Sequence, residues 1–230
     1  MPKKKILLLG CTGSSGIKTL EKALAQGHLV TVYARSPEKV PDHLTGHPHF
    51  KMVEGTLTST DILFPLLPEF DTIISLLGPI NIRHKQGPLA EFWRTLLTQL
   101  KTLPEPPHVL AMGTISLKDP SDKFSLKRLA LVGVVSVVAR GAYKEIQATA
   151  AAFREEGNGV PWTNWRVAML SDGKGATQPV AGSVGKDGWK LSTSKENLAT
   201  WLVEEAEKGS KDSEWIGKFP ALWSGTKKKL

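Results

Sequence analysis

Three glycines at intervals of three follow an apolar run in the segment ILLLGCTGSSG, residues 6–16. The four apolar residues before Gly10 have the composition of a buried strand, and a helical pattern begins near Ser14 and continues to about Gln26. A tight strand-to-helix turn this close to the N-terminus limits the folds that are open to the chain. It predicts that the chain begins with a βαβ unit.

Further strand-like runs continue this alternation along the first half of the chain. They cover residues 28–34, 49–55, 71–78 and 108–113. Between the last two, residues 87–103 carry apolar side chains at helical spacing. Strands that alternate with helices build a parallel sheet that is buried on both faces. We therefore expect an α/β protein with a Rossmann-type, doubly wound parallel sheet.

The second half of the chain is expected to complete the sheet. A helical region ends near Glu156, and a sixth strand, WTNWRVAML, spans residues 162–170. Residues 171–188 are rich in glycine and predict loops and a hairpin. Ser194 has the place of an N-cap for a helix that stops at Gly209. A last strand is expected from about 214 to 222.

The three glycines have separate roles in a dinucleotide site. Gly10 would close the first strand, Gly13 would let the backbone approach a pyrophosphate, and Gly16 would let the helix pack closely on the sheet. Free N–H groups and the positive end of the helix dipole then form an anion site without a charged side chain. The expected donors are Thr12, Gly13, Ser14, Ser15, Gly16 and Ile17. An ordinary tight turn is the alternative.

The second strand ends on Arg35 and Ser36, where NAD-specific sites usually carry an acidic residue. A cation beside a hydroxyl suits a 2′-phosphate, so we expect NADP(H) as the cofactor; a solvated arginine is the alternative. Two further strand ends would border the same crevice. Thr56 is expected near the adenine, and Leu77 and Gly78 along the ribose and nicotinamide, although each could be ordinary loop.

Four segments together resemble the atypical short-chain dehydrogenase/reductases: GCTGSSG at 10–16, YARS at 33–36, LLG at 76–78 and AMGTIS at 111–116. Within them the chain looks most like the NAD(P)-binding, NmrA-like branch that includes flavin reductase/biliverdin reductase B. The resemblance implies NADP(H) and a small hydrophobic or aromatic substrate. Residues 1–230 are then one domain, with a dinucleotide-binding core over about 1–116 and a substrate-side region over about 117–230.

Classical members of that superfamily place a Tyr-x-x-x-Lys pair on the helix after the fifth strand, where the lysine lowers the tyrosine pKa. Here Tyr143 is the tyrosine in that region, and Gln147 stands where the lysine would be. Thr114 and Ser116, just past the fifth strand, could donate to a substrate oxygen. We expect Thr114 and Tyr143 to flank the acceptor; a packing tyrosine and turn hydroxyls are the alternatives.

The leading hypothesis is an NADP(H)-dependent oxidoreductase that transfers hydride to a small aromatic, flavin-like or quinone-like acceptor. The branch that the chain resembles also contains regulators that bind the dinucleotide without turning it over, so a non-catalytic NADP(H) sensor remains an alternative. A non-redox isomerase or cyclase on the same fold is a third.

Residues 126–139 form the most apolar segment of the chain. We expect a buried helix between the sheet and the substrate site. The alternatives are a lid over an apolar substrate, an oligomer surface, and a membrane-surface patch flanked by Lys127, Arg128 and Arg140. The segment is too short to span a bilayer.

Charge and cysteine content exclude several other classes. The net charge is +8, but six lysines at the two ends leave 8 − 6 = +2 for the rest, so we expect no nucleic-acid partner. The chain lacks a signal peptide pattern and has a single cysteine, Cys11, which fits a soluble cytoplasmic protein without membrane association. His43, His47 and His49 lie close together without other ligand types, and no metal site is expected.

Overall fold

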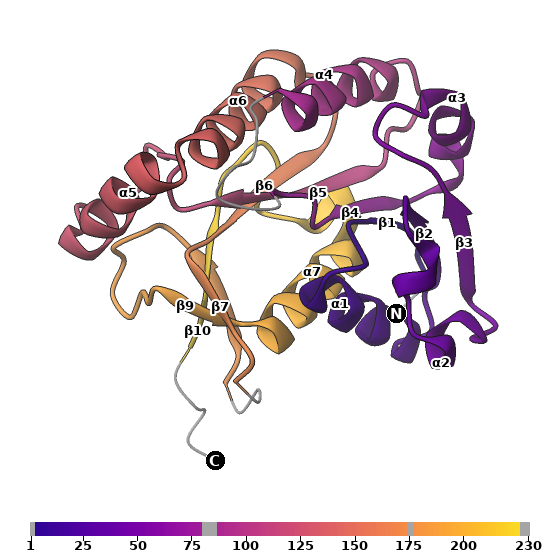
Figure 1. Ribbon diagram of the computed structural model, residues 1–230, viewed down its shortest axis with the longest axis horizontal. Helices are drawn as coiled ribbons and strands as arrows, with labels where there is room; N and C mark the ends of the chain where they lie inside the picture. Colours follow the sequence, from indigo (N-terminus) through magenta and orange to yellow (C-terminus); the bar gives the residue numbers. More distant parts are fainter. Residues whose placement is uncertain (1–2, 80–86, 174–176, 226–230) are drawn as a thin grey trace.

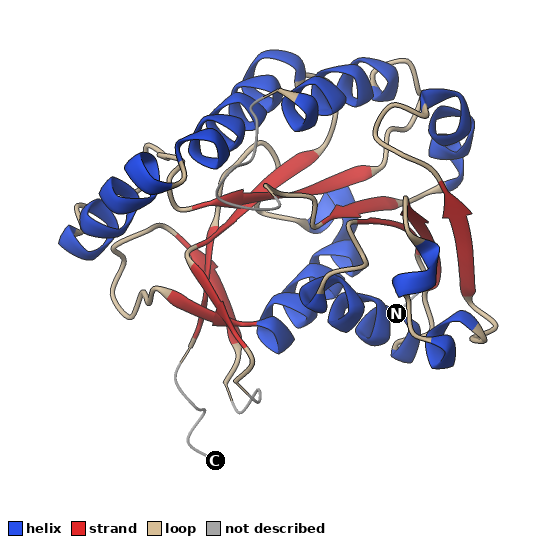
Figure 2. Ribbon diagram, viewed as in Figure 1, coloured by secondary structure: helices blue, strands red, loops and turns tan. Residues whose placement is uncertain are grey.

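The computed structural model describes residues 3–79, 87–173 and 177–225. An eight-stranded sheet in the order β3-β2-β1-β4-β5-β6-β10-β8 has helices on both faces, and β7 and β9 form a separate two-stranded sheet (Figures 1 and 2). The strands are β1 (Lys5–Leu9), β2 (Leu29–Ala34), β3 (Phe50–Glu54), β4 (Thr72–Ser75), β5 (His108–Thr114), β6 (Trp162–Val167), β7 (Met169–Ser171), β8 (Pro179–Gly182), β9 (Ser192–Ser194) and β10 (Ala221–Ser224). The helices are α1 (Ser14–Ala25), α2 (Asp42–Thr45), α3 (Thr60–Leu63), α4 (Pro88–Leu100), α5 (Leu126–Val138), α6 (Arg140–Glu156) and α7 (Lys195–Asp212), with short 3-10 turns at Pro37–Lys39 and Phe64–Glu69.

The strand order reverses at β1. From this central strand the chain proceeds to β2 and β3 on one side and later to β4, β5 and β6 on the other, all of them parallel. Leu9 is in register with Tyr33 of β2 and Ser75 of β4, so these three strands end together. In open α/β sheets the crevice beyond the carboxyl ends at such a reversal is where ligands bind. The expected Rossmann-type α/β architecture is confirmed.

Two cores cover the two faces of the sheet, and β1 contributes to both. Leu7 and Leu9 join the core beneath α4 and α6, whereas Ile6 and Leu8 join the core beneath α1 and α7. Successive side chains of a strand point to opposite faces, so a run of four apolar residues fits a strand that helices cover on both sides. The central strand therefore fixes the glycine turn between two packed layers.

The later strands differ from the expectation. The predicted strand 162–170 is two strands, because β6 ends at Val167 and β7 pairs with β9 instead. The last strand runs from 221 to 224 rather than 214 to 222, since Gly217 has φ of 72° and Pro220 has no N–H to donate to a ladder. The hairpin expected within 171–188 is not formed by its described part: β8 pairs antiparallel with β10, and residues 174–176 lie outside the described chain.

Helix α5 is not the buried helix that its sequence predicts. None of its side chains is buried, and it continues the line of α6 out to the far left of Figure 1. Ser125 caps its N-terminus by accepting a hydrogen bond from the Arg128 N–H at 3.3 Å. Only one side of the helix, through Leu131 and Val132, packs against a small apolar cluster of Ile115, Val184 and Ala221. Apolar content predicted burial, but the helix lies beyond the layers that would cover it.

Candidate functional site

The glycine turn has the backbone that the sequence predicts. Gly10 has φ of 75°, a conformation that side chains rarely adopt, and a methyl group there would lie 2.9 Å from the Leu76 carbonyl carbon and the Leu77 nitrogen. A methyl group at Gly16 would lie 2.6 Å from the Cα and carbonyl oxygen of Cys11. These two glycines are therefore required by the close approach of β1, the segment after β4 and the start of α1.

Gly13 differs from the other two glycines of the turn. It is exposed and extended, and a methyl group built on it would meet nothing within 4 Å. Nothing in the described protein requires glycine here, so the open space in front of Gly13 is a cradle that a side chain would fill. A pyrophosphate that approaches the backbone closely would account for glycine at this position.

The N-terminus of α1 directs its free N–H groups into the same space. The Ile17 N–H donates to the Gly13 carbonyl oxygen at 2.9 Å, whereas the N–H groups of Ser14, Ser15 and Gly16 precede the first helical hydrogen bond. The first turn contains no acidic residue that would repel an anion. Of the expected donors, Ile17 is thus left with only its half-buried side chain to contact a cofactor.

Cys11 lies inside the turn but is fully buried. Burial raises the pKa of its thiol to about 12, so the thiol stays protonated at neutral pH. It fills space beneath the loop rather than acting as a nucleophile.

Arg35 is exposed directly after β2, and Ser36 follows it at the start of the first 3-10 turn. Within the described residues the guanidinium of Arg35 has no hydrogen-bond or ion-pair partner. A cation that faces solvent without a carboxylate is available to an anionic ligand.

Tyr33, two residues before Arg35, links the loop that follows β3 to β2. Its buried hydroxyl donates to the carbonyl oxygen of Thr56 at 2.8 Å. Burial raises the pKa of Tyr33, which keeps the hydroxyl a donor. The Thr56 hydroxyl is exposed and bonds to the hydroxyls of Thr58 and Ser59 at 3.0 Å and 2.9 Å. Sequence reasoning missed this role of Tyr33, because the contact joins residues 23 positions apart.

Leu77 and Gly78 follow β4 and are half-buried beside Gly10. The Leu77 N–H donates to the Ser75 hydroxyl at 3.3 Å, and a methyl group on Gly78 would overlap the end of the Met112 side chain on β5. The two residues therefore lie at the strand reversal, as the sequence predicts, and residues 80–86 beyond them are outside the described chain.

The carboxyl end of β5 carries a pair of hydroxyls. The Thr114 and Ser116 oxygens lie 2.5 Å apart, and Thr114 is half-buried. The next three carbonyl oxygens are all held by side chains from other elements: Arg128 binds those of Ile115 and Leu117 at 2.7 and 2.9 Å, and Gln147 binds that of Ser116 at 3.1 Å. The segment after β5 is thereby fixed.

Tyr143 lies in the first turn of α6 and is half-buried, and its hydroxyl has no hydrogen-bond partner in the part of the chain that is described. Residues four apart share one face of a helix, so Tyr143 lies on the face from which Gln147 reaches Ser116. Gln147, in the place of the missing lysine, acts as an anchor for the backbone.

Two buried charged groups hold this region together, and the sequence did not single out either. Arg166, on β6, is fully buried and donates to both carboxylate oxygens of Asp122, at 2.6 and 2.8 Å, and to the Leu117 carbonyl oxygen at 2.8 Å. Burial by itself raises the pKa of the Asp122 carboxyl. The hydrogen bonds and charge of Arg166, together with hydrogen bonds from the backbone N–H groups of Asp119 and Val184, outweigh burial, so that this pKa lies below its ordinary value.

Glu145, on α6, is the second of these groups and is also fully buried. Its carboxylate accepts hydrogen bonds from the backbone N–H groups of Gly87 and, at 2.7 Å, Ala90. A carboxylate at these first N–H groups of α4 satisfies donors that have no partner within the helix.

Alternative sites are weaker. Among the described residues no group of three or more histidine, cysteine or acidic side chains could hold a metal ion. A groove of about 1330 Å³ lies at the amino ends of the strands, where Lys5, Asp71, Pro107 and Pro161 line it. It is at the opposite edge from the glycine turn and carries charges of both signs.

Comparisons with known proteins agree with this geometry. A family model described as NAD(P)H-binding matches residues 10–208. A short-chain dehydrogenase/reductase of Veillonella parvula, solved in complex with NADP, has a TM-score of 0.75 and 13% identity, over 99% of this chain and 98% of that one. An oxidoreductase of Lactococcus lactis has a TM-score of 0.68 and 17% identity, over 96% and 91%.

A Streptococcus pneumoniae protein, provisionally described as an NADH-flavin reductase, has a TM-score of 0.63 and 19% identity, over 96% of this chain and 99% of that one. At such identities the structures support the fold, and the family match covers most of the chain. The expected kinship with NAD(P)-binding Rossmann proteins is confirmed, and this chain belongs to the NAD(P)H-binding family.

Proposed function

We propose that the protein is an NADP(H)-dependent reductase that passes hydride to a small aromatic, flavin-like or quinone-like acceptor. The observation that carries the proposal is the open cradle at Gly13 with Arg35 free at the next strand end. The NADP complex of the Veillonella parvula protein and the flavin-reductase description of the Streptococcus pneumoniae protein support the same direction. Residues of about 1–116 would hold the cofactor, and about 117–230 would form the substrate side.

The residues of the crevice suit the parts of NADP(H). The N–H groups at the start of α1 would bind the pyrophosphate, and Arg35 with Ser36 would bind the 2′-phosphate. Thr56 would border the adenine, and Leu77 with Gly78 the ribose and nicotinamide. Reduced nicotinamide supplies the hydride when it is bound. The full set that we propose for the cofactor is Gly10, Thr12, Gly13, Ser14, Ser15, Gly16, Ile17, Arg35, Ser36, Thr56, Leu77 and Gly78.

Thr114 and Tyr143 are proposed to flank the acceptor. The Thr114 hydroxyl, paired with Ser116, can donate to an acceptor oxygen while the backbone behind it is held by Arg128 and Gln147. The Tyr143 hydroxyl can donate a proton or lie against an aromatic ring. Since no lysine follows it at i+4, holding a flat acceptor in position matters more here than a strong proton donor.

The first test mixes the purified protein with NADPH and a panel of flavins, quinones and aldehydes, and follows the absorbance of reduced nicotinamide. We expect NADPH consumption with a flavin or quinone, and a lower kcat/KM in the Thr114→Val and Tyr143→Phe variants. Tight NADPH binding without turnover of any acceptor would instead favour a non-catalytic NADP(H) sensor. One observation favours this second candidate: Gln147, at the position of the catalytic lysine, holds the backbone at Ser116 instead.

The second test replaces Arg35. Charge-assisted hydrogen bonds to a phosphate contribute roughly 1.5–3 kcal/mol, so Arg35→Asp should weaken NADPH binding by about ten- to a hundredfold. NADH, which has no 2′-phosphate, should bind about as before. Calorimetry with both cofactors measures this. Lys51→Asp, with the same charge change on the exposed side of β3, is the matched control, and an unchanged NADPH affinity in Arg35→Asp would refute the assignment.

A further inference from the structure

The outer side of α5 is the most apolar exposed surface of the described chain. Ten large hydrophobic side chains of the described residues are exposed. Six of these ten lie within residues 124–138, with exposed fractions of 59% to 80%. They are Phe124, Leu126, Leu129, Val134, Val137 and Val138. Ala130 and Gly133, also exposed, lie between them at helical spacing. The result is a continuous apolar stripe, which we call the α5 stripe.

The opposite side of α5 is already used. Leu131 and Val132 pack on the cluster of Ile115, Val184 and Ala221, and the Arg128 guanidinium turns inward to two carbonyl oxygens after β5. These contacts fix the rotation of the helix about its axis. The α5 stripe therefore faces away from these contacts.

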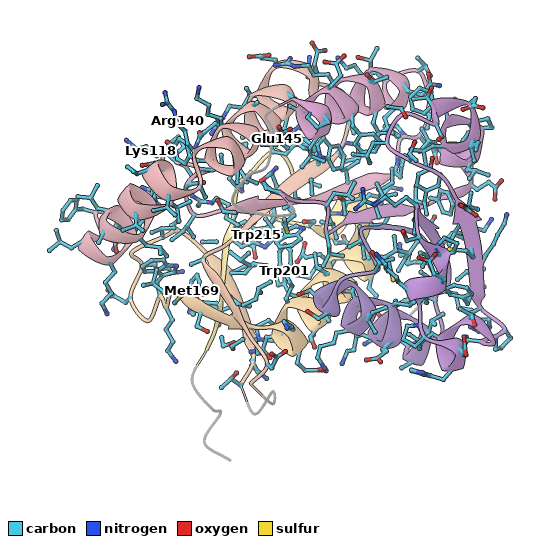
Figure 3. The ribbon with its side chains drawn as sticks, viewed as in Figure 1. Lys118, Arg140, Glu145, Met169, Trp201 and Trp215 are labelled. Atoms are coloured by element: carbon cyan, nitrogen blue, oxygen red, sulfur yellow. The ribbon has the colours of Figure 1, made fainter. Side chains whose placement is uncertain are left out.

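The charged side chains of the segment that carries the stripe are all positive. Residues 123–144 contain five cationic side chains, Lys123, Lys127, Arg128, Arg140 and Lys144, and no acidic one. All except Arg128 are exposed. Lys118 is another exposed lysine, and Figure 3 labels it and Arg140.

The carboxylates that border this segment in sequence cannot neutralise it. Asp122 is paired with Arg166, and Glu145 is buried against the start of α4. The partner that fits this surface is therefore apolar in the middle and negative around it.

We propose that α5 docks in the plane of an anionic lipid bilayer surface. Helices that present an apolar face with basic residues beside it lie at the boundary of headgroups and acyl chains, and each nearby lysine or arginine adds attraction to anionic lipid. No helix in the described residues has the length and apolar content to cross a membrane, so the contact would be with one surface. The sequence favoured a buried helix over residues 126–139 and left a membrane-surface patch as an alternative; the structure exposes this helix.

A second copy of the chain is a poorer occupant of the α5 stripe. A two-fold contact brings the same surface of both copies together, so the basic flanks of α5 would meet each other with no carboxylate of this segment between them. Headgroup phosphates and carboxylates supply the missing negative charge.

The test is sedimentation of the full chain with vesicles of phosphatidylcholine alone or with added phosphatidylserine. We expect the protein to pellet with the phosphatidylserine vesicles, and less as salt is raised. The uncharged change Leu129→Gln/Val137→Gln should weaken this binding about tenfold or more by removing apolar contact. The matched control, Leu29→Gln/Ile62→Gln, removes two exposed aliphatic side chains elsewhere and should bind like the unaltered protein.

A second readout locates the helix itself. Since Cys11 is buried and is the single cysteine of the chain, Val137→Cys offers one site for a polarity-sensitive fluorophore. Its emission should shift to the blue with phosphatidylserine vesicles. Absence of binding, binding that survives Leu129→Gln/Val137→Gln, or a label that stays in water would each overturn the proposal. A dimer in sedimentation velocity that this double change abolishes, without vesicle binding, would assign the stripe to a second copy.

Discussion

Replacing Arg166 with methionine should lower the free energy of unfolding by about 3–5 kcal/mol, because it leaves the Asp122 carboxylate without its partner in a nearly buried place. The same change removes one of the two hydrogen bonds to the Leu117 carbonyl oxygen, which Arg128 also binds. Urea unfolding at neutral pH measures the loss. Replacing both partners, Asp122→Leu/Arg166→Met, should recover a large part of the lost stability. Removing one partner leaves a buried charge unpaired, whereas removing both leaves no charge there. A loss equal in the single and double variants would contradict this account.

The free energy of unfolding at acidic pH gives an independent check on the pair of Asp122 and Arg166. The pKa of Asp122 is depressed in the folded protein, so its stabilisation is present above the ordinary pKa near 4 and is lost as the pH falls through the folded value. In the Arg166→Met variant we expect burial, the largest cause, to raise that pKa against the two backbone hydrogen bonds from Asp119 and Val184 that remain. The variant should therefore gain stability from this carboxyl on acidification, whereas the unaltered protein loses it.

Gly13→Ala should weaken NADPH binding by about tenfold or more and leave the free energy of unfolding within about 1 kcal/mol of the original. A methyl group at this position meets no protein atom within 4 Å, and the backbone is extended, so the folded protein has room for it. The same methyl group would occupy the space into which the pyrophosphate must fit. Calorimetric binding and urea unfolding on one preparation separate the two effects.

Two other glycines serve as controls for Gly13. Gly16→Ala should lower stability as well as binding, by about 1–3 kcal/mol, because its methyl group would lie 2.6 Å from backbone atoms of Gly10 and Cys11. Gly133→Ala, in the exposed side of α5, should leave NADPH binding unchanged, since it too has open space but lies far from the glycine turn. Undiminished NADPH affinity in Gly13→Ala would place the pyrophosphate elsewhere.

Local patterns were enough to predict the first half of the fold. Helix α1 and strands β1, β2 and β5 begin and end within one or two residues of the sequence-based limits, because a strand buried on both faces is a continuous apolar run and a glycine turn marks where it stops. The second half was less predictable. The predicted strand 162–170 divides into β6 and β7 because β7 pairs with β9 in a second sheet, and β10 starts late and pairs with β8. Both outcomes depend on pairing between residues far apart in the sequence.

The acceptor side of the site shows the same limit. Thr114 and Tyr143 could be named from their positions after β5, but the contacts of Gln147, Arg128 and Arg166 with one short backbone segment could not. Those three side chains come from α6, α5 and β6, and nothing in their local sequence indicates a shared target. The one available signal is an arginine within a strand that is expected to be buried. An arginine is almost never fully buried unless it is paired, so a buried partner for Arg166 could have been inferred.

The sequence by itself determined that this chain folds around a glycine turn and a parallel sheet, because both depend on short-range spacing and on the φ angle and close packing that glycine permits. It also placed a cation, Arg35, where the second strand ends. Only the tertiary structure decided which charges are paired, which carbonyls are held and which face of α5 meets solvent. An apolar helix is buried only if a layer covers it, and whether a layer lies there depends on the packing of the whole chain.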